Sequence, residues 1–123
     1  EDVQTVSNMQ PNQVDSSAIK ELTPHAMLVL LAICRRLKNV EEIATGDVGQ
    51  LYRVVCEEFE TDPKGHTTLW KHLKTLEEES IITARSAPVK QGRGRTQFFS
   101  MPQTLPADMA GRLESLLPAQ LRR

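Results

Sequence analysis

The longest apolar stretch of the chain lies at residues 26–34, one residue after a threonine–proline pair. Thr23 can cap a helix with its hydroxyl group, and Pro24 suits the first helical position because the N–H that it lacks would be unpaired there. The stretch is apolar nearly all round, which is typical of a helix that is buried on every side. We therefore predict a central buried helix over residues 24–38.

Two further helices are predicted after the central one, joined by a tight turn. The first is expected to be capped by Thr45 or Asp47 and to stop near Pro63. Pro63 and Gly65 indicate the turn, and the second helix is predicted over residues 66–79. The apolar positions of both helices recur with the helical period: Val48, Leu51, Tyr52, Val55, Cys56 and Phe59 in the first, and Leu69, Leu73 and Leu76 in the second.

The last third of the chain predicts a hairpin and a closing helix. Two β-prone runs, residues 81–89 and 96–101, flank a basic segment that contains two glycines. This pattern indicates a hairpin with a long basic tip. Trp70 is expected to pack under that hairpin. A helix that starts after Pro106 is expected to end near Pro118.

These elements predict one domain of a recognisable type. Two helices joined by a tight turn, the later one with basic and hydroxyl groups on its outer face, form a helix-turn-helix. A basic hairpin directly after it corresponds to a wing. The expected fold class is therefore mainly α with a small β-hairpin, a winged helix-turn-helix with an extra C-terminal helix. The domain is expected over residues 15–117, between a flexible linker at 1–14 and a tail at 118–123.

Charges of the two signs are segregated along the chain, although the formal net charge is only -1. Acidic residues are concentrated in residues 41–62. Residues 63–76 and 80–107 contain basic residues and no acidic residue. A nearly neutral protein can therefore present one basic surface to a polyanion.

The basic surface should come from the outer face of the helix at 66–79 and from the wing at about 88–96. Lysine and arginine neutralise phosphates or reach guanine, and threonine hydroxyls bond phosphates or base edges. Glycines in the wing allow the backbone to approach DNA closely. The candidate DNA contacts are Lys64, His66, Thr67, Thr68, Lys71, Lys74, Thr75, Arg85, Lys90, Arg93 and Arg95.

Other classes of function are not expected. His66 and His72 lack the spacing that stacks two metal ligands one helical turn apart, and no cysteine pair joins them. No nucleophile, base and orienting group can be combined, so we expect neither an enzyme nor a metal site. Cys34 and Cys56 fall in apolar helical patterns and are interpreted as buried free thiols. The longest apolar run is less than half of the roughly 20 residues that a membrane span needs.

The sequence resembles the C-terminal winged-helix domain of the archaeal origin-recognition and cell-division-control initiators. The resemblance covers residues 15–101. It rests on several motifs in a fixed order: Ile19-Lys-Glu-Leu-Thr-Pro-His25, Leu28-Val-Leu-Leu-Ala-Ile33, Thr45-Gly-Asp-Val48 with Tyr52, Cys56-Glu-Glu58, Ile81-Ile82 and Gly92-Arg-Gly-Arg-Thr96.

In that family an ATPase module of the AAA+ class precedes the domain and holds ATP or ADP with Mg²⁺. The chain begins at Glu1 and has no P-loop, so we expect an excised fragment with no cofactor of its own. The resemblance implies binding of double-stranded origin DNA, with the helix at 66–79 in the major groove. It further implies a monomeric domain in the cytoplasm, associated with the nucleoid, with the replicative helicase and the ATPase module as further partners.

Two short segments depart from the family pattern. His66, Thr67 and Thr68 stand where the family often has arginine or glutamine, and Glu78, Glu79 and Ser80 stand where it tends to have apolar residues and glycine. The second departure suggests a divergent paralogue. Two alternative functions remain, a protein-interaction module that uses the acidic segment at 41–62 and a free-standing transcription regulator, because the fold alone does not separate them.

Overall fold

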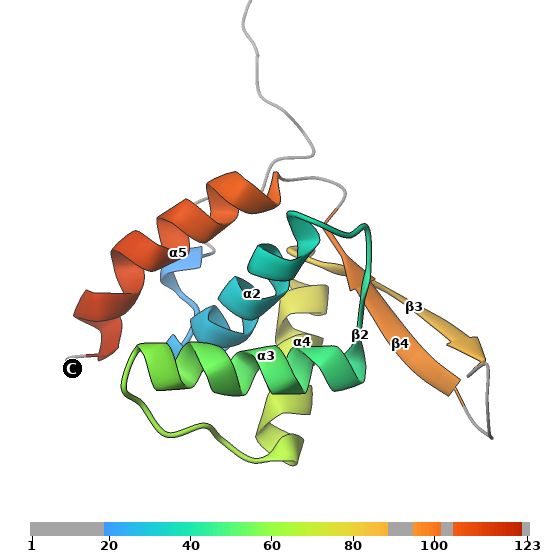
Figure 1. The fold of residues 1–123 in the computed structure, drawn as a ribbon, viewed down its shortest axis with the longest axis horizontal. Coiled ribbons are helices and arrows are strands. Elements are labelled where there is room, and N and C mark those ends of the chain that lie inside the picture. Colours follow the sequence, from blue (N-terminus) through green and yellow to red (C-terminus); the bar gives the residue numbers. More distant parts are fainter. Residues whose placement is uncertain (1–18, 89–94, 102–104, 122–123) are drawn as a thin grey trace, which may run out of the picture.

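The computed structural model describes residues 19–88, 95–101 and 105–121. Figure 1 shows a helical body with a hairpin extending from one side. This is the winged-helix architecture that the sequence predicts. The elements follow in the order α2 (Pro24–Leu37), β2 (Ile43–Ala44), α3 (Thr45–Glu58), α4 (His66–Glu78), β3 (Thr83–Pro88), β4 (Arg95–Ser100) and α5 (Pro106–Leu121).

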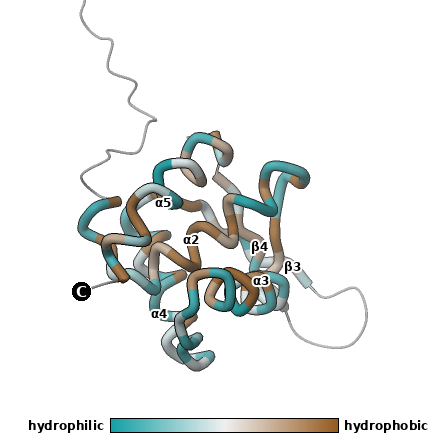
Figure 2. The backbone as a smooth tube through the Cα atoms, turned by 60° about the vertical axis from the view of Figure 1, so that its left-hand side comes forward, coloured by the Kyte–Doolittle hydropathy of each residue, from teal (hydrophilic) through white to brown (hydrophobic). Residues whose placement is uncertain are grey.

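Helix α2 forms the centre of the core. The hydroxyl of Thr23 caps it by accepting a hydrogen bond from the Ala26 N–H at 3.2 Å, as predicted. Leu30 and Leu31 have no exposed surface, because α3, α4 and α5 all pack against this helix. Figure 2 shows the same arrangement from another side, with α2 enclosed by the other elements. Both cysteines are buried free thiols, as expected.

Helices α3 and α4 form the helix-turn-helix. α4 begins at the predicted residue, and Leu69, Leu73 and Leu76 face the core. α3 ends in a left-handed residue, Glu60, with φ of 57°. The N–H of Thr61 then bonds the carbonyl of Cys56 at 2.9 Å, which is the Schellman arrangement that closes a helix and redirects the chain.

Two predicted helix ends are wrong. α3 starts at Thr45 itself, after Ala44, and no side chain of the described residues caps it. The Thr45 hydroxyl instead donates to the carbonyl of Gln97 at 3.1 Å. α5 continues through Pro118 to Leu121. Proline removes one helical N–H, but the buried Leu117 and the partly buried Leu121 anchor the last turn on both sides of it.

The sheet contains three strands in the order β2-β4-β3. β3 and β4 form the predicted hairpin, with Thr83 opposite Ser100 and Pro88 opposite Arg95. β2 is an addition that the sequence analysis did not predict. It places Ile43 opposite Phe99, and both side chains are buried. The base of the wing is therefore fixed to the helical core.

Several predictions fall on residues that the structure does not describe. The linker at 1–14 and the wing-tip residues Lys90 and Arg93 lie outside the described ranges. Among residues 19–88, 95–101 and 105–121, no helix has the length and apolar character needed to cross a bilayer. The same residues contain no group of histidine, cysteine and acidic side chains placed to hold a metal ion.

Candidate nucleic-acid interface

The outer face of α4 presents the predicted basic and hydroxyl side chains to solvent. Thr67, Lys71, Lys74 and Thr75 are exposed, and Thr68 is half-buried. They lie opposite the core stripe, as the helical period predicts. The Thr75 hydroxyl donates to the carbonyl of Lys71 at 3.0 Å, so its proton is used within the helix. The remaining groups form a surface that includes Lys71 and Lys74, which have no ion-pair partner among the residues that the structure describes.

A buried tyrosine holds the turn that leads into α4. Tyr52 comes from α3 and is 1% exposed. Its hydroxyl oxygen accepts a hydrogen bond from the backbone N–H of Lys64 at 2.8 Å and lies 2.8 Å from Nδ1 of His25 in α2. One hydroxyl therefore links α2, α3 and the turn. The sequence analysis identified Tyr52 only as a core position.

Three titratable groups under this surface are held in their neutral forms. Burial lowers the pKa of His25, and the nearby Lys64 and His72 lower it further. The pKa of His72 is also lowered, mainly by burial and to a smaller degree by the charge of Lys64. The buried Nε2 of His72 has no hydrogen-bond partner among the described residues. Burial raises the pKa of Tyr52 to about 12. The positive charge of this region therefore comes from lysine and not from His25 or His72.

Trp70 lies at the junction between α4 and the wing. Its side chain is 37% exposed and borders a hollow of about 160 Å³ together with Leu73, Gln97 and Phe99. It therefore lies against β4 as predicted, although it is only partly covered. The indole N–H donates to Nε2 of His66 at 2.8 Å.

The base of the wing holds an arginine that is paired with an acid. Arg85 in β3 donates from Nε to Glu42 at 2.6 Å and from Nη2 at 2.8 Å. Its guanidinium also lies 4.8 Å from the centre of the Phe98 ring. The hydrogen bond from Arg85 lowers the pKa of Glu42. Arg85 was predicted as a DNA contact, but here its charge is already neutralised by Glu42.

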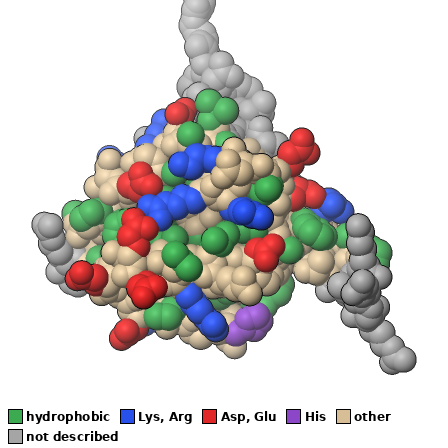
Figure 3. All heavy atoms as spheres, in the orientation of Figure 1, with side chains coloured by type: hydrophobic (Ala, Val, Ile, Leu, Met, Phe, Trp, Pro, Cys, Tyr) green, Lys and Arg blue, Asp and Glu red, His purple; other side chains and the backbone are tan. Residues whose placement is uncertain are grey.

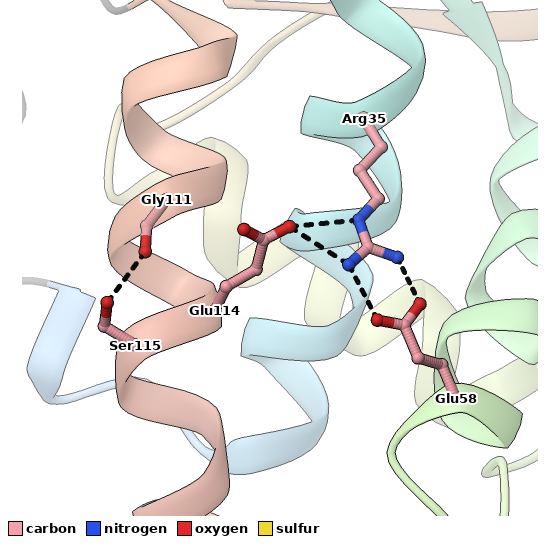
Figure 4. Close-up of polar contacts among 5 residues, drawn as sticks. All are labelled: Arg35, Glu58, Gly111, Glu114 and Ser115. Carbon is pink, nitrogen blue, oxygen red and sulfur yellow. Dashed lines mark hydrogen bonds and ion pairs between the residues drawn. The ribbon is translucent and has the colours of Figure 1, made fainter.

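The face formed by α3 and α5 carries both acidic and basic side chains. Figure 3 shows them interspersed over α3 and α5. In Figure 4 the guanidinium of Arg35 lies between two carboxylates. Its Nη1 is 2.5 Å from Glu58 of α3, and its Nη2 is 3.0 Å from Glu114 of α5. Glu58, which is part of the acidic segment at 41–62, therefore forms an ion pair between two helices of the domain.

Comparison with known sequences identifies related replication proteins. The family described as "CDC6, C terminal winged helix domain" matches residues 17–105. ORC1-type DNA replication protein 2 of Saccharolobus solfataricus is 31% identical over 110 residues, which are 88% of this chain and 25% of the relative. ORC1-type DNA replication protein 15 of Haloarcula marismortui is 35% identical over 79 residues, 63% of this chain and 19% of the relative. The chain thus spans about a quarter or less of these relatives.

Comparison with solved structures gives the same result. Cdc6p from Pyrobaculum aerophilum superposes with a TM-score of 0.77 at 28% identity, over 89% of this chain and 27% of that one. The Aeropyrum pernix ORC1 protein, solved in complex with DNA, superposes with a TM-score of 0.71 at 22% identity, over 87% of this chain and 27% of that one. The second likeness shows the shared fold. By its sequence match and its fold, the chain belongs to the family of C-terminal winged-helix domains of CDC6.

Proposed function

We propose that this domain binds double-stranded DNA at a replication origin, with α4 as the recognition helix in the major groove and the wing along the minor groove or backbone. The observation that carries the proposal is the outer face of α4. It exposes Lys71 and Lys74 beside Thr67, in a segment, residues 63–76, that contains no acid. Tyr52 holds the start of this helix in place.

The relatives support the same proposal. The matched proteins are ORC1-type DNA replication proteins, and a structure of the same fold was solved in complex with DNA. In this proposal the domain is the DNA-reading part of an archaeal initiator, and an AAA+ module of the whole protein binds ATP or ADP with Mg²⁺. The domain works as a monomer on the cytoplasmic nucleoid, where the replicative helicase and the AAA+ module are its further partners.

The recognition helix and the wing have different tasks in this proposal. Base edges carry the sequence code, so Thr67, Thr68 and Lys71 contribute to sequence preference. Contacts to phosphates fix the position of the protein without reading sequence. Those contacts come from the other basic side chains: Lys64, Lys74, Lys90, Arg93 and Arg95. Arg85 can contact a phosphate only when its hydrogen bonds to Glu42 are broken.

A salt titration tests the proposal. Each phosphate that is neutralised releases counterions, so four to six such contacts give a slope of log K against log salt of roughly -4 to -5. Fluorescence anisotropy with a labelled duplex measures this slope. Lys74→Gln should weaken binding and reduce the slope by about one, because Lys74 is one of the proposed phosphate contacts. An affinity for the duplex that does not change with salt concentration would contradict DNA binding.

The protein-interaction alternative predicts a different pattern. Arg93→Ala with Arg95→Ala should weaken binding to all DNA sequences alike if the wing contacts the backbone. Glu57→Lys tests the acidic surface of α3, because Glu57 is exposed, whereas Glu58 must be left intact for its pairing with Arg35. DNA binding that is indifferent to the wing pair, together with loss of a protein partner in Glu57→Lys, would favour the alternative.

A further inference from the structure

The first residue of the recognition helix is joined to the only tryptophan of the chain. His66 opens α4 directly after Gly65, and Trp70 follows one turn later. The Trp70 indole N–H donates to Nε2 of His66 at 2.8 Å, and the rings meet edge to face with their centres 6.2 Å apart. Both side chains are exposed, and His66 is one of the candidate DNA contacts that the sequence indicates.

This hydrogen bond determines which imidazole nitrogen carries the proton. A neutral imidazole has one N–H and one bare nitrogen, and only the bare nitrogen can accept. Because Nε2 of His66 accepts from Trp70, neutral His66 carries its proton on Nδ1. An unrestrained histidine in water favours the opposite tautomer, with the proton on Nε2. The contact with Trp70 therefore reverses the ordinary preference.

The tryptophan itself lies against the wing. Its ring borders the hollow between α4 and β4, where Leu73, Gln97 and Phe99 lie. Phe99 is 1% exposed and belongs to the core. The indole therefore lies against β4 while it donates to His66, so the position of the imidazole is related to both the helix and the sheet.

We propose that Trp70 is a positioning residue that holds His66 as an Nδ1–H donor toward a hydrogen-bond acceptor of duplex DNA. The inference rests on the proposed DNA binding and adds a donor of defined identity at the N-terminal end of α4. Recognition helices contact base edges through this end. The acceptors within reach of such a donor are purine N7, guanine O6 and thymine O4 in the major groove, or a phosphate oxygen.

The tautomer can be read in the free protein. Nitrogen-15 NMR distinguishes a protonated from a bare imidazole nitrogen, and the three histidines of the chain are assigned with His→Gln variants. We expect His66 to carry its proton on Nδ1 in the wild-type chain. Trp70→Phe keeps an aromatic ring but removes the N–H donor, so the proton should return to Nε2.

Binding measurements test the role of the donor. The probe is a short labelled duplex with a randomised centre, and the bound fraction is sequenced. A net hydrogen bond corresponds to about a two- to tenfold change in affinity, so Trp70→Phe and His66→Ala should each weaken binding by that factor. His66→Asn places an amide N–H near the position of Nδ1 without needing Trp70. It should retain affinity, and Trp70→Phe should have no further effect in that background.

The sequenced pools distinguish the two kinds of acceptor. Loss of preference at one base position in Trp70→Phe identifies a base acceptor, whereas uniform weakening identifies a phosphate. An Nε2-protonated His66 in the wild-type chain, or wild-type affinity in a folded Trp70→Phe, would overturn the inference alone. A wild-type chain that binds no duplex at low salt would overturn the proposed function and this contact together, while the tautomer would still be measured.

Discussion

Tyr52 and His25 form a hydrogen bond that depends on protonation. The Tyr52 oxygen accepts from the Lys64 N–H, so its own proton is available for Nδ1 of His25 at 2.8 Å. That donation requires a bare Nδ1. A proton added to His25 would remove the acceptor and place a charge in a site that burial and Lys64 already make unfavourable.

Stability should therefore fall at mildly acidic pH. The folded chain lowers the pKa of His25 and His72 below the ordinary histidine value of 6.5, so below that pH the unfolded chain binds more protons. The contribution to the free energy of unfolding is complete above pH 6.5 and is lost as the pH falls through the folded pKa values. Chemical denaturation followed by circular dichroism at several pH values measures it.

The acidic side chains titrate in a separate range. Hydrogen bonds from arginine lower the pKa of Glu42 and Glu58 below their ordinary value of 4.5, so their contribution is lost only at more acidic pH. His25→Gln with His72→Gln should flatten the pH dependence between 6.5 and 4.5. An unchanged slope in this double variant would assign the effect to other groups.

Helix α4 ends with the same motif as α3. Ser80 is left-handed, with φ of 62°, and the Ile81 N–H bonds the carbonyl of Leu76 at 2.9 Å. Ile81 and Leu76 are both buried, which is the apolar contact that accompanies a Schellman end. A side chain at a left-handed position is unfavourable by roughly 1 kcal/mol. The chain thus carries serine where glycine would fit best.

Ser80→Gly should therefore stabilise the domain. Relief of the left-handed strain, less the added entropy of glycine in the unfolded chain, leaves a gain of about 0.5 kcal/mol. The midpoint of urea denaturation should rise with an unchanged slope. Ser80→Ala is the control, because alanine keeps the strain and should give no gain. Equal effects of glycine and alanine would show that the backbone angle is not the cause.

The two faces of α4 should separate stability from DNA binding. Leu73 is 1% exposed, and Leu73→Ala should lower the free energy of unfolding by about 2–5 kcal/mol. Lys71 is exposed two residues earlier, so Lys71→Ala should change stability by less than about 0.5 kcal/mol while it weakens DNA binding. Urea denaturation and anisotropy on the same samples compare the two, and equal stability losses would contradict the assignment of the faces.

Sequence periodicity predicted the helices well because it is a local property. The starts of α2 and α4 and the core stripe of α4 follow from capping residues and apolar spacing. β2 has two residues, too few to show a period, and its partner Phe99 is distant in sequence. This pairing also explains the wrong cap of α3, because Ala44 belongs to the sheet and the Thr45 hydroxyl bonds to Gln97.

In the candidate interface, too, the local features follow from the sequence and the contacts between elements do not. The exposed face of α4 follows from the helical period, and the Trp70–His66 contact has the i,i+4 spacing of neighbours on a helix. The contacts of Tyr52 with His25 and Lys64, and of Arg85 with Glu42, join different elements. Such contacts depend on the packed structure, so the spacing of residues in the sequence does not reveal them.

The balance of charge around the wing gives a further prediction for DNA binding. Glu42 neutralises Arg85, so Glu42→Gln removes one negative charge and frees one arginine. DNA binding should become tighter, and the salt slope should become steeper by about one if Arg85 meets a phosphate. Glu41→Gln is the matched control, because Glu41 is an exposed neighbour and its replacement removes the same charge without freeing Arg85. Equal effects of the two variants would show that Arg85 does not reach DNA.

The central position of α2 has a consequence for the chain during its synthesis. The residues of α2 are buried by α3 and α4, which are made next, but also by α5, which follows the hairpin in chain order. A chain that has left the ribosome only as far as β3 therefore exposes the side of α2 that Met109, Leu113 and Leu117 later cover. Exposed apolar surface of this kind promotes aggregation of partly made chains. Emergence of α5 from the ribosome is thus the step that ends this vulnerable period.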